Sequence, residues 1–184
     1  MSIFFTSDLH FDHANIIKYC NRPFSSVEEM RETLIKNYNK VVKPNDTVYN
    51  LGDVSMKANY EQLAQFFSRL NGTHIVLHGN HDNDKYFFDL VKNGIIKAYN
   101  QAIGESFNGQ YIWMSHYAHR VWNLSHRGSW HIYGHSHGSL PSYGMSYDVG
   151  VDGNNYTPVS FDQLAVIMKD LKDKHEAAMM GVYS

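Results

Sequence analysis

The sequence of 184 residues predicts an α/β fold in a single domain, residues 1–184. Three observations support this prediction. Helical and strand-like segments alternate in the first half, strand-like segments follow one another in the second half, and acidic and imidazole side chains recur where strands are expected to end. A hydrophobic fraction of 43% is sufficient for a buried core at this length and argues against a disordered chain.

The first half of the sequence predicts parallel β-α-β units. Short apolar runs are typical of buried strands, and apolar residues at helical spacing indicate helices. Ser25 and Glu28 form a capping-box signature at the start of one helix, and Pro44 stops it. Asn71 and Gly72 are suited to end the next helix. The expected elements are strands at Ser2–Ser7, Thr47–Leu51 and His74–His78, and helices at Ser25–Val42 and Asn59–Leu70.

The second half predicts a run of strands and a closing helix. Asn108-Gly109 is a hairpin-turn signal between two strands. Because no helix is expected between the later strands, we predict a meander. The expected elements are strands at Ile95–Tyr99, Ala102–Phe107, Tyr111–Ser115, His131–Gly134 and Tyr147–Val151, and a helix at Ser160–Leu171.

Composition limits the classes of function. A net charge of −2 without a Lys/Arg tract does not favour non-specific binding of nucleic acid. Cys20 is the only cysteine, so no intrachain disulfide can form, which favours a reducing compartment. The N-terminus has no basic region or long apolar run, and no stretch of about 18 apolar residues occurs. We therefore expect a cytoplasmic protein that makes no use of a membrane.

The clearest chemical signal is a set of oxygen and imidazole donors placed directly after predicted strands. In open α/β sheets this edge is where ligands bind. None of the donors is a thiolate, so the set suits Mn, Fe, Zn or Ni better than a structural zinc–thiolate site. The clusters are Asp8-Leu9-His10, Gly52-Asp53, Gly79-Asn80-His81-Asp82, His116 and Gly134-His135-Ser136-His137.

The order of these clusters resembles that of the calcineurin-like metallophosphoesterases. The resemblance extends from Asp8 to His137, and the segments 12–17 and 20–24 are similar to a small bacterial and phage-borne subgroup of predicted phosphoesterases. It implies a four-layer α/β/β/α sandwich of mixed sheets, with a metal site at the C-terminal ends of the strands. It also implies two divalent transition-metal ions as cofactors.

The resemblance further implies a role for each donor. Asp53 would bridge the two metals; Asp8, His10 and His137 would complete one of them, and Asn80, His116 and His135 the other. The i, i+2 spacing of Asp8/His10 and His135/His137 would direct both side chains of each pair to one side of an extended chain. His81 would be the general acid, and Asp82 would orient His81. Gly52, Gly79 and Gly134 would allow close backbone approach or a positive φ.

Three further residues are candidates for substrate binding, each with a structural alternative. His13 would contact substrate or only cap the helix beginning near Ala14. Arg22 would contact the phosphate bidentately or form a surface salt bridge. Arg120, with His119 and Trp122, would line a substrate pocket or lie in a solvated loop.

The function favoured is a metal-dependent phosphohydrolase in which activated water attacks phosphorus in line, with Mn the favoured metal. The expected partner is a small phosphodiester, nucleotide or phosphomonoester, and a phosphodiesterase is favoured over a phosphatase. Two alternatives stay open. A nuclease acting on DNA or RNA is disfavoured by the lack of a basic patch, and a non-catalytic scaffold is disfavoured because no ligand position is substituted. The oligomeric state is left open.

Overall fold

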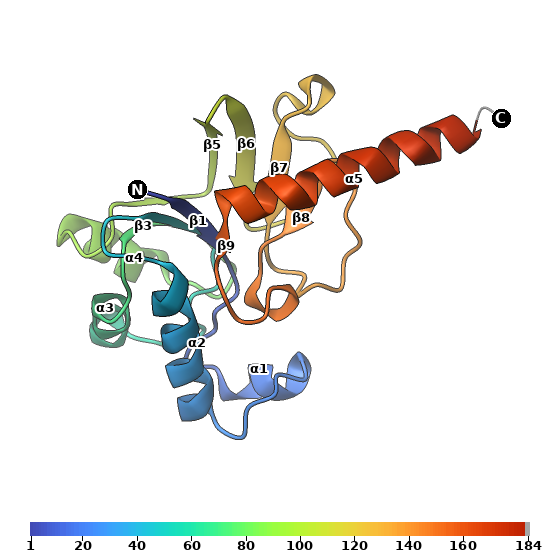
Figure 1. Cartoon of the computed structure of the whole chain (residues 1–184). Coiled ribbons are helices and arrows are strands. Elements are labelled where there is room, and N and C mark those ends of the chain that lie inside the picture. The colour runs from blue at the N-terminus through green and yellow to red at the C-terminus, as the bar shows by residue number, and fades with distance from the viewer. Residues whose placement is uncertain (183–184) are drawn as a thin grey trace.

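The computed structural model describes the backbone of residues 1–182 and the side chains of residues 1–174. Two β-sheets lie against each other, with helices outside them (Figure 1). The strand order is β4-β3-β2-β1-β9 in the first sheet and β5-β6-β7-β8 in the second. Each sheet contains both parallel and antiparallel pairs. The predicted α/β class with mixed sheets is thus confirmed.

The first sheet is built from β-α-β units, as predicted. Strands β1 to β4 are parallel to their neighbours, and β9 is antiparallel to β1. The strands are β1 (Ile3–Thr6), β2 (Thr47–Asn50), β3 (Thr73–Leu77), β4 (Ala98–Asn100) and β9 (Val159–Ser160). The helices between them are α1 (Ala14–Tyr19), α2 (Val27–Val41), α3 (Tyr60–Ser68) and α4 (Asp84–Lys92).

Two details of these helices differ from the sequence prediction. Helix α2 begins one residue later than expected, because Ser26 and not Ser25 accepts a hydrogen bond from the backbone N–H of Glu29. Helix α4 was not predicted; Asn83 caps it, and only Phe87 and Leu90 are buried on its inner face. Phe87, Leu90 and Val91 recur at helical spacing on the face that packs against the core, so the periodic signal was present in the sequence and was overlooked.

The second sheet corrects the predicted meander. Its strands are β5 (Ala102–Phe107), β6 (Gln110–Ser115), β7 (Trp130–Tyr133) and β8 (Ser146–Asp148). Only β5 and β6 form an antiparallel hairpin, through Asn108 and Gly109 at φ values of 50° and 83°. The pairs β6–β7 and β7–β8 are parallel, because the intervening loops return the chain to the opposite edge. As a result β6 and β7 end at the same edge of the sheet.

Two hydrophobic cores hold the layers together. One lies between the first sheet and helices α2, α3 and α4, and includes Met30, Phe66 and Phe87. The other fills the space between the sheets, where Phe5 meets Ile112. Helix α5 (Phe161–Val182) directs Leu164 and Met168 into this second core and is longer than the predicted helix. Its C-terminal part extends away from the sheets (Figure 1).

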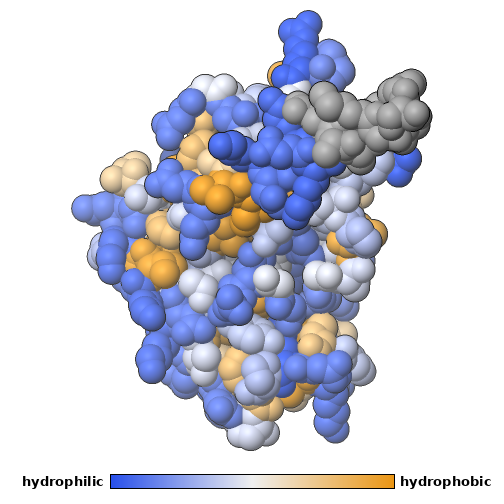
Figure 2. Space-filling view, turned by 45° about the vertical axis from the view of Figure 1, so that its right-hand side comes forward, coloured by the Kyte–Doolittle hydropathy of each residue, from blue (hydrophilic) through white to orange (hydrophobic). Residues whose placement is uncertain are grey.

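The surface is mainly hydrophilic. In the view of Figure 2, hydrophobic side chains form small separate patches among polar ones. Within the described part of the chain, no helix is both long enough and apolar enough to cross a membrane.

Candidate metal centre

The predicted donors come together at one edge of the paired sheets. Asp8 and His10 follow β1, Asp53 follows β2, and Asn80 follows β3. His116 follows β6, while His135 and His137 follow β7. Parallel pairing of β6 with β7 is what brings the last three residues to the same edge as the others.

The backbone at these donors is not extended, which corrects the reasoning from i, i+2 spacing. Asp8, His10, Asp53, His135 and His137 all have positive φ, between 48° and 65°. Non-glycine residues rarely occupy this left-handed region, and such strain clusters at functional sites. The two members of each pair therefore converge through tight turns after the strand, and not through strand alternation.

Glycines allow these turns to approach one another. Gly52 has a φ of +102°, and a Cβ placed on it would lie 2.6 Å from the backbone nitrogen of Gly79. A Cβ on Gly134 would collide with the side chains of Ser7 and Asp8. The predicted role of the glycines in close approach is confirmed by these contacts.

Asp8, His10 and His137 form one group of ligating atoms, all within 4.8 Å of one another. His10 is buried, and neither of its ring nitrogens makes a hydrogen bond to any described residue. Burial lowers the pKa of His10 to about 3 and raises the pKa of Asp8 to about 7. Buried polar atoms normally have a partner, and the neutral imidazole of His10 has none for its ring nitrogens. A cation bound beside the carboxyl group of Asp8 would supply that partner.

Asp53, His116 and His135 form a second such group, also within 4.8 Å. His116 contacts the carbonyl oxygen of Leu51 through Nδ1 at 2.8 Å, so its Nε2 points toward the site. Nε2 lies 3.1 Å from Oδ1 of Asn80, which adds a neutral oxygen donor to the group. Burial opposes protonation of His116, but its hydrogen bond to Asp53 raises its pKa above the ordinary value. The environment of Nε2 thus favours positive charge.

The two groups meet at the carboxylate of Asp53. Its Oδ2 lies 3.6 Å from Nε2 of His10 and 3.5 Å from Nε2 of His116, one from each group. Its Oδ1 accepts a hydrogen bond from the backbone N–H of His81 at 2.9 Å. Although burial raises the pKa of Asp53, His116 and the other donors bring it down to about 2, so the carboxylate is charged.

A buried ion pair supports His137, and it gives Arg22 a different role from the one predicted. Nδ1 of His137 lies 2.6 Å from Oδ2 of Asp152, and Asp152 accepts two hydrogen bonds from the guanidinium of Arg22 at 2.8 Å each. Arg22 also donates to the carbonyl oxygens of Asp8 and Leu9.

The guanidinium of Arg22 is therefore fully engaged beneath the site. The side chain of Arg22 has no exposed surface. Neither a contact with substrate phosphate nor a surface salt bridge describes it.

Asp82 also differs from its predicted role. Its carboxylate accepts hydrogen bonds from the backbone N–H groups of Asp53, Val54, Ser55 and Gly79, at 2.9 to 3.4 Å. Both oxygens are used in this way, so Asp82 holds the loops after β2 and β3 together and does not orient the imidazole of His81. Burial and the nearby charge of Asp53 raise the pKa of Asp82 to about 7, against the effect of these hydrogen bonds.

Two carboxylates of the site were missed by sequence reasoning. Asp152 supports His137, and Asp148 accepts hydrogen bonds from the hydroxyl of Ser136 and the N–H of Gly138. Ser136 thus uses its hydroxyl to fix its own loop. Asp148 is the last residue of β8 and Asp152 follows shortly after it; this position at the end of a strand was the available signal.

An open cleft of about 750 Å³ covers the two groups. His81 and His13 line it, with ring centres 6.3 Å apart. His13 is the N-cap residue of α1, but its side chain makes no capping hydrogen bond and its Nδ1 is buried without a partner. Of its two predicted roles, capping by the side chain is therefore wrong, and its ring faces the cleft.

Arg120 does not line this cleft. Its guanidinium lies 4.0 Å from the ring centre of Tyr143 and borders an adjoining cavity of about 360 Å³. His119 borders the same cavity, whereas Trp122 is buried and donates a hydrogen bond to the carbonyl of Ser129.

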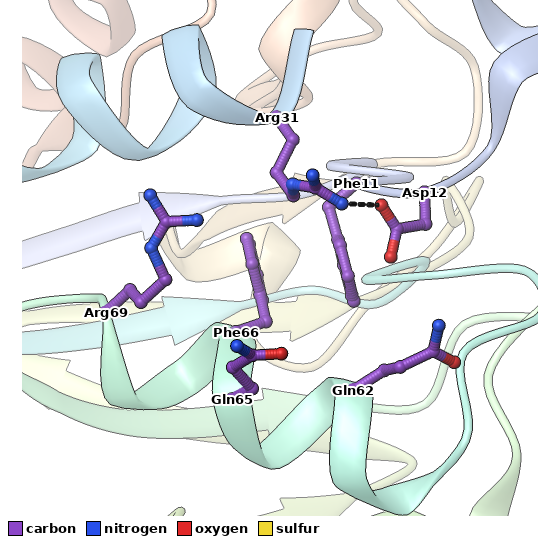
Figure 3. Close-up of a pocket in the computed structure, with 7 residues that line it drawn as sticks. All are labelled: Phe11, Asp12, Arg31, Gln62, Gln65, Phe66 and Arg69. Atoms are coloured by element: carbon purple, nitrogen blue, oxygen red, sulfur yellow. Dashed lines mark hydrogen bonds and ion pairs between the residues drawn. The ribbon is translucent and has the colours of Figure 1, made fainter. Parts of the chain in front are cut away.

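A smaller pocket between α2 and α3 has a different chemistry (Figure 3). The rings of Phe11 and Phe66 stack in it with centres 4.0 Å apart, and Arg31 forms an ion pair with Asp12 at 2.7 Å. Figure 3 shows no imidazole among its lining residues, so it lacks the donors of the metal centre. Its contacts anchor the segment that follows His10 to helix α3.

A third group of potential ligands overlaps the centre but fits a metal poorly. Cys20, His137 and Asp152 lie within 4.8 Å of one another. Burial raises the pKa of the Cys20 thiol to about 11, which disfavours the thiolate that a metal requires. Asp152 is already bonded to both Arg22 and His137.

Comparison with known proteins agrees with this arrangement. Residues 1–149 match the family model described as calcineurin-like phosphoesterase. An uncharacterized protein of Methanocaldococcus jannaschii is 38% identical over 175 residues, which cover 91% of each chain. The gene 66 protein of Mycobacterium phage L5 is 38% identical over 81 residues, which cover 42% of this chain and 38% of the phage protein.

Two solved structures are also similar. The crystal structure of a protein of unknown function from Aquifex aeolicus has a TM-score of 0.70 and 25% identity, covering 90% of this chain and 98% of that one. An archaeal phosphodiesterase has a TM-score of 0.52 and 19% identity over 82% of each chain, which shows a shared fold.

Replacement of Arg22 tests the buried ion pair. Arg22→Met should lower the free energy of unfolding by about 3–5 kcal/mol, because it removes the guanidinium from the buried Asp152 carboxylate and leaves it with His137 alone. The matched control is Arg69→Met, which breaks the exposed bidentate pair with Glu32 and should cost less than about 1 kcal/mol. Urea denaturation of both variants measures the difference; equal losses would contradict the role assigned to Arg22.

Proposed function

Because the chain belongs to the calcineurin-like phosphoesterase family, we propose that it hydrolyses a phosphodiester at a centre that binds two divalent metal ions. Membership of the family implies metal-dependent hydrolysis of phosphoesters. The use of two ions, the preference for diesters and the residue roles below are parts of the proposal.

The observation that carries the proposal is the position of the Asp53 carboxylate. One oxygen faces an imidazole nitrogen from each of the two ligand groups at about the same distance, 3.6 and 3.5 Å. A carboxylate between two sets of nitrogen and oxygen donors is suited to bridge two cations. Asp8, His10 and His137 would hold one with Asp53, and Asn80, His116 and His135 the other.

The donor set fits such ions. It contains imidazole, carboxylate and amide groups, which suit Mn, Fe, Zn or Ni, and Mn is the favoured candidate. His116 and His137 are each fixed through Nδ1, by a backbone carbonyl and by Asp152, which is how metal-binding histidines are commonly oriented. When bound, two ions would neutralise the phosphate oxygens and lower the pKa of a water molecule.

His81 is placed to act as the general acid. Its backbone is held by Oδ1 of Asp53, and its ring lies 5.5 Å from that of His10 on the wall of the cleft. An imidazolium there would donate its proton to the leaving oxygen, a role that histidine commonly takes in general acid catalysis. His13 lies beside His81 and would contact the same part of the substrate.

A diester is favoured over a monoester because of the shape of the site. The cleft is open and adjoins a second cavity, so substituents on both sides of a phosphate have room. The structurally similar archaeal protein is described as a phosphodiesterase, which supports the same choice here.

Metal reconstitution tests the proposal directly. Protein stripped of metal by a chelator should not hydrolyse bis-p-nitrophenyl phosphate or p-nitrophenyl phosphate. Adding Mn or Ni, but not Mg, should restore release of p-nitrophenolate from the diester more than from the monoester. Turnover of the monoester alone would instead indicate a phosphatase, and no turnover by folded protein with any of Mn, Ni or Zn would contradict the proposed hydrolase.

Asp53→Asn tests the bridge. The amide keeps the size of the side chain but removes the charge shared by both groups, so metal content should fall below two ions and diester turnover should fall by about 10²–10³-fold or more. The control is Asp173→Asn, which removes an exposed charge on helix α5 away from the cleft and should leave both quantities unchanged. Metal analysis and kinetics on the same preparations make the comparison; full activity in Asp53→Asn would rule out the bridging role.

His81→Ala tests the general acid. The variant should keep its metal content but slow phenyl esters about 10²–10⁴-fold more than p-nitrophenyl esters, because only the poorer leaving group needs protonation. His126→Ala, an exposed histidine on the 3₁₀ turn Ser125–Arg127, is the control. Equal losses on the two esters would argue against His81 as the proton donor.

A further inference from the structure

A second cavity adjoins the metal cleft and is built by the segments that follow three of the proposed ligands. Residues 118–120 come directly after His116 and Tyr117, and residues 140–143 come shortly after His135 and His137. Leu140 lines both the cleft and this cavity of about 360 Å³. A substrate bound at the metal centre can therefore extend past Leu140 into the second cavity.

The second cavity has apolar and aromatic side chains in its lining, among them Tyr143 and the shared Leu140. Leu140 and Tyr143 are about half exposed, at 46% and 50%. Exposed aromatic and aliphatic side chains beside a polar metal centre provide surface for a planar group attached to the phosphate.

Arg120 supplies the charged group of this cavity. Its guanidinium is held 4.0 Å from the ring centre of Tyr143, and within the described residues it forms no ion pair with a carboxylate. A planar guanidinium fixed on an aromatic ring can stack on a second ring or donate hydrogen bonds to its edge. This combination suits a nucleobase better than an alkyl chain or a simple sugar.

The position of His81 indicates which side of the phosphate enters the cavity. His81 and His13 lie on the wall formed by the loop after β3 and by the start of α1, together with Tyr19. The leaving group must be near the general acid, so it lies toward that wall. The second cavity shares Leu140 with the cleft and is lined by none of His13, Tyr19 and His81, so it would receive the other substituent.

Resting on the proposed function, we infer that the cavity bordered by Arg120, Leu140 and Tyr143 is a nucleoside subsite. It holds the base of a nucleotide diester whose nucleoside stays on the phosphate after cleavage. The substrate class is then a nucleoside monophosphate esterified to a second alcohol.

Two chromogenic esters test this inference with the same leaving group. Thymidine 5′-monophosphate p-nitrophenyl ester and methyl p-nitrophenyl phosphate differ only in the substituent that remains on phosphorus. Stacking of one base contributes about 1–3 kcal/mol, so the manganese-loaded protein should prefer the thymidine ester in kcat/KM by about 5- to 150-fold. Arg120→Ala and Tyr143→Ala should each remove most of this preference.

Arg127→Ala is the matched control, since Arg127 is exposed on the same loop and borders neither cavity. It should leave the preference unchanged. Equal kcat/KM for the two esters in the wild-type protein would overturn the subsite while leaving the hydrolase intact. An undiminished preference in both Arg120→Ala and Tyr143→Ala would overturn it as well.

Binding of thymidine 5′-monophosphate, the expected product, separates the subsite from the chemistry. Calorimetry on the manganese-loaded protein should show a lower dissociation constant for this nucleotide than for methyl phosphate. Arg120→Ala should bring the two dissociation constants closer together. If neither ester is hydrolysed, this result still supports the nucleoside subsite and only the proposed hydrolysis fails. Equal affinity for nucleotide and methyl phosphate would overturn the subsite whatever the kinetics show.

Discussion

Buried carboxylates that accept backbone hydrogen bonds hold the whole metal centre in place. The donors lie in tight turns with positive φ, a conformation that costs energy at each residue. Asp82 ties the turn after β2 to the turn after β3, and Asp8 accepts from the N–H of His135 through both oxygens. Asp148 does the same within the turn after β7. Without these acceptors the strained turns would leave N–H groups buried and unpaired.

The aspartates of the site have different roles, which explains why it contains more carboxylates than the proposed pair of cations would need. Asp53 turns Oδ2 toward both ligand groups and is held at low pKa by the donors around it. Asp82 and Asp148 face the backbone, and Asp152 joins Arg22 to His137. Of these four carboxylates only that of Asp53 faces both ligand groups, and Asp8 is the other aspartate whose oxygens lie among the candidate ligands. Residue type alone does not separate these roles, because each is a buried aspartate at the same sheet edge.

The cleft and the second cavity present different side chains to a bound molecule. His81 and His13 border the cleft on the side of α1, while Leu140 leads from the cleft to Arg120 and Tyr143. The loops that carry these groups are continuous with the turns that carry the ligands. Under the proposed function, a substrate that contacts these loops would be coupled mechanically to the positions of the proposed ligands.

The sequence by itself determined the alternation of strands and helices in the first half, the hairpin at Asn108-Gly109 and the donors at the strand ends. These features depend on local periodicity and on turn chemistry, which act over a few residues. Tertiary structure alone decided that β6 and β7 run parallel, that Asp82 caps loops and that Arg22 pairs with Asp152 across 130 positions of the chain. A strand has the same side-chain pattern in either direction, and a buried charge takes whichever partner the fold brings to it; both outcomes depend on contacts between distant segments.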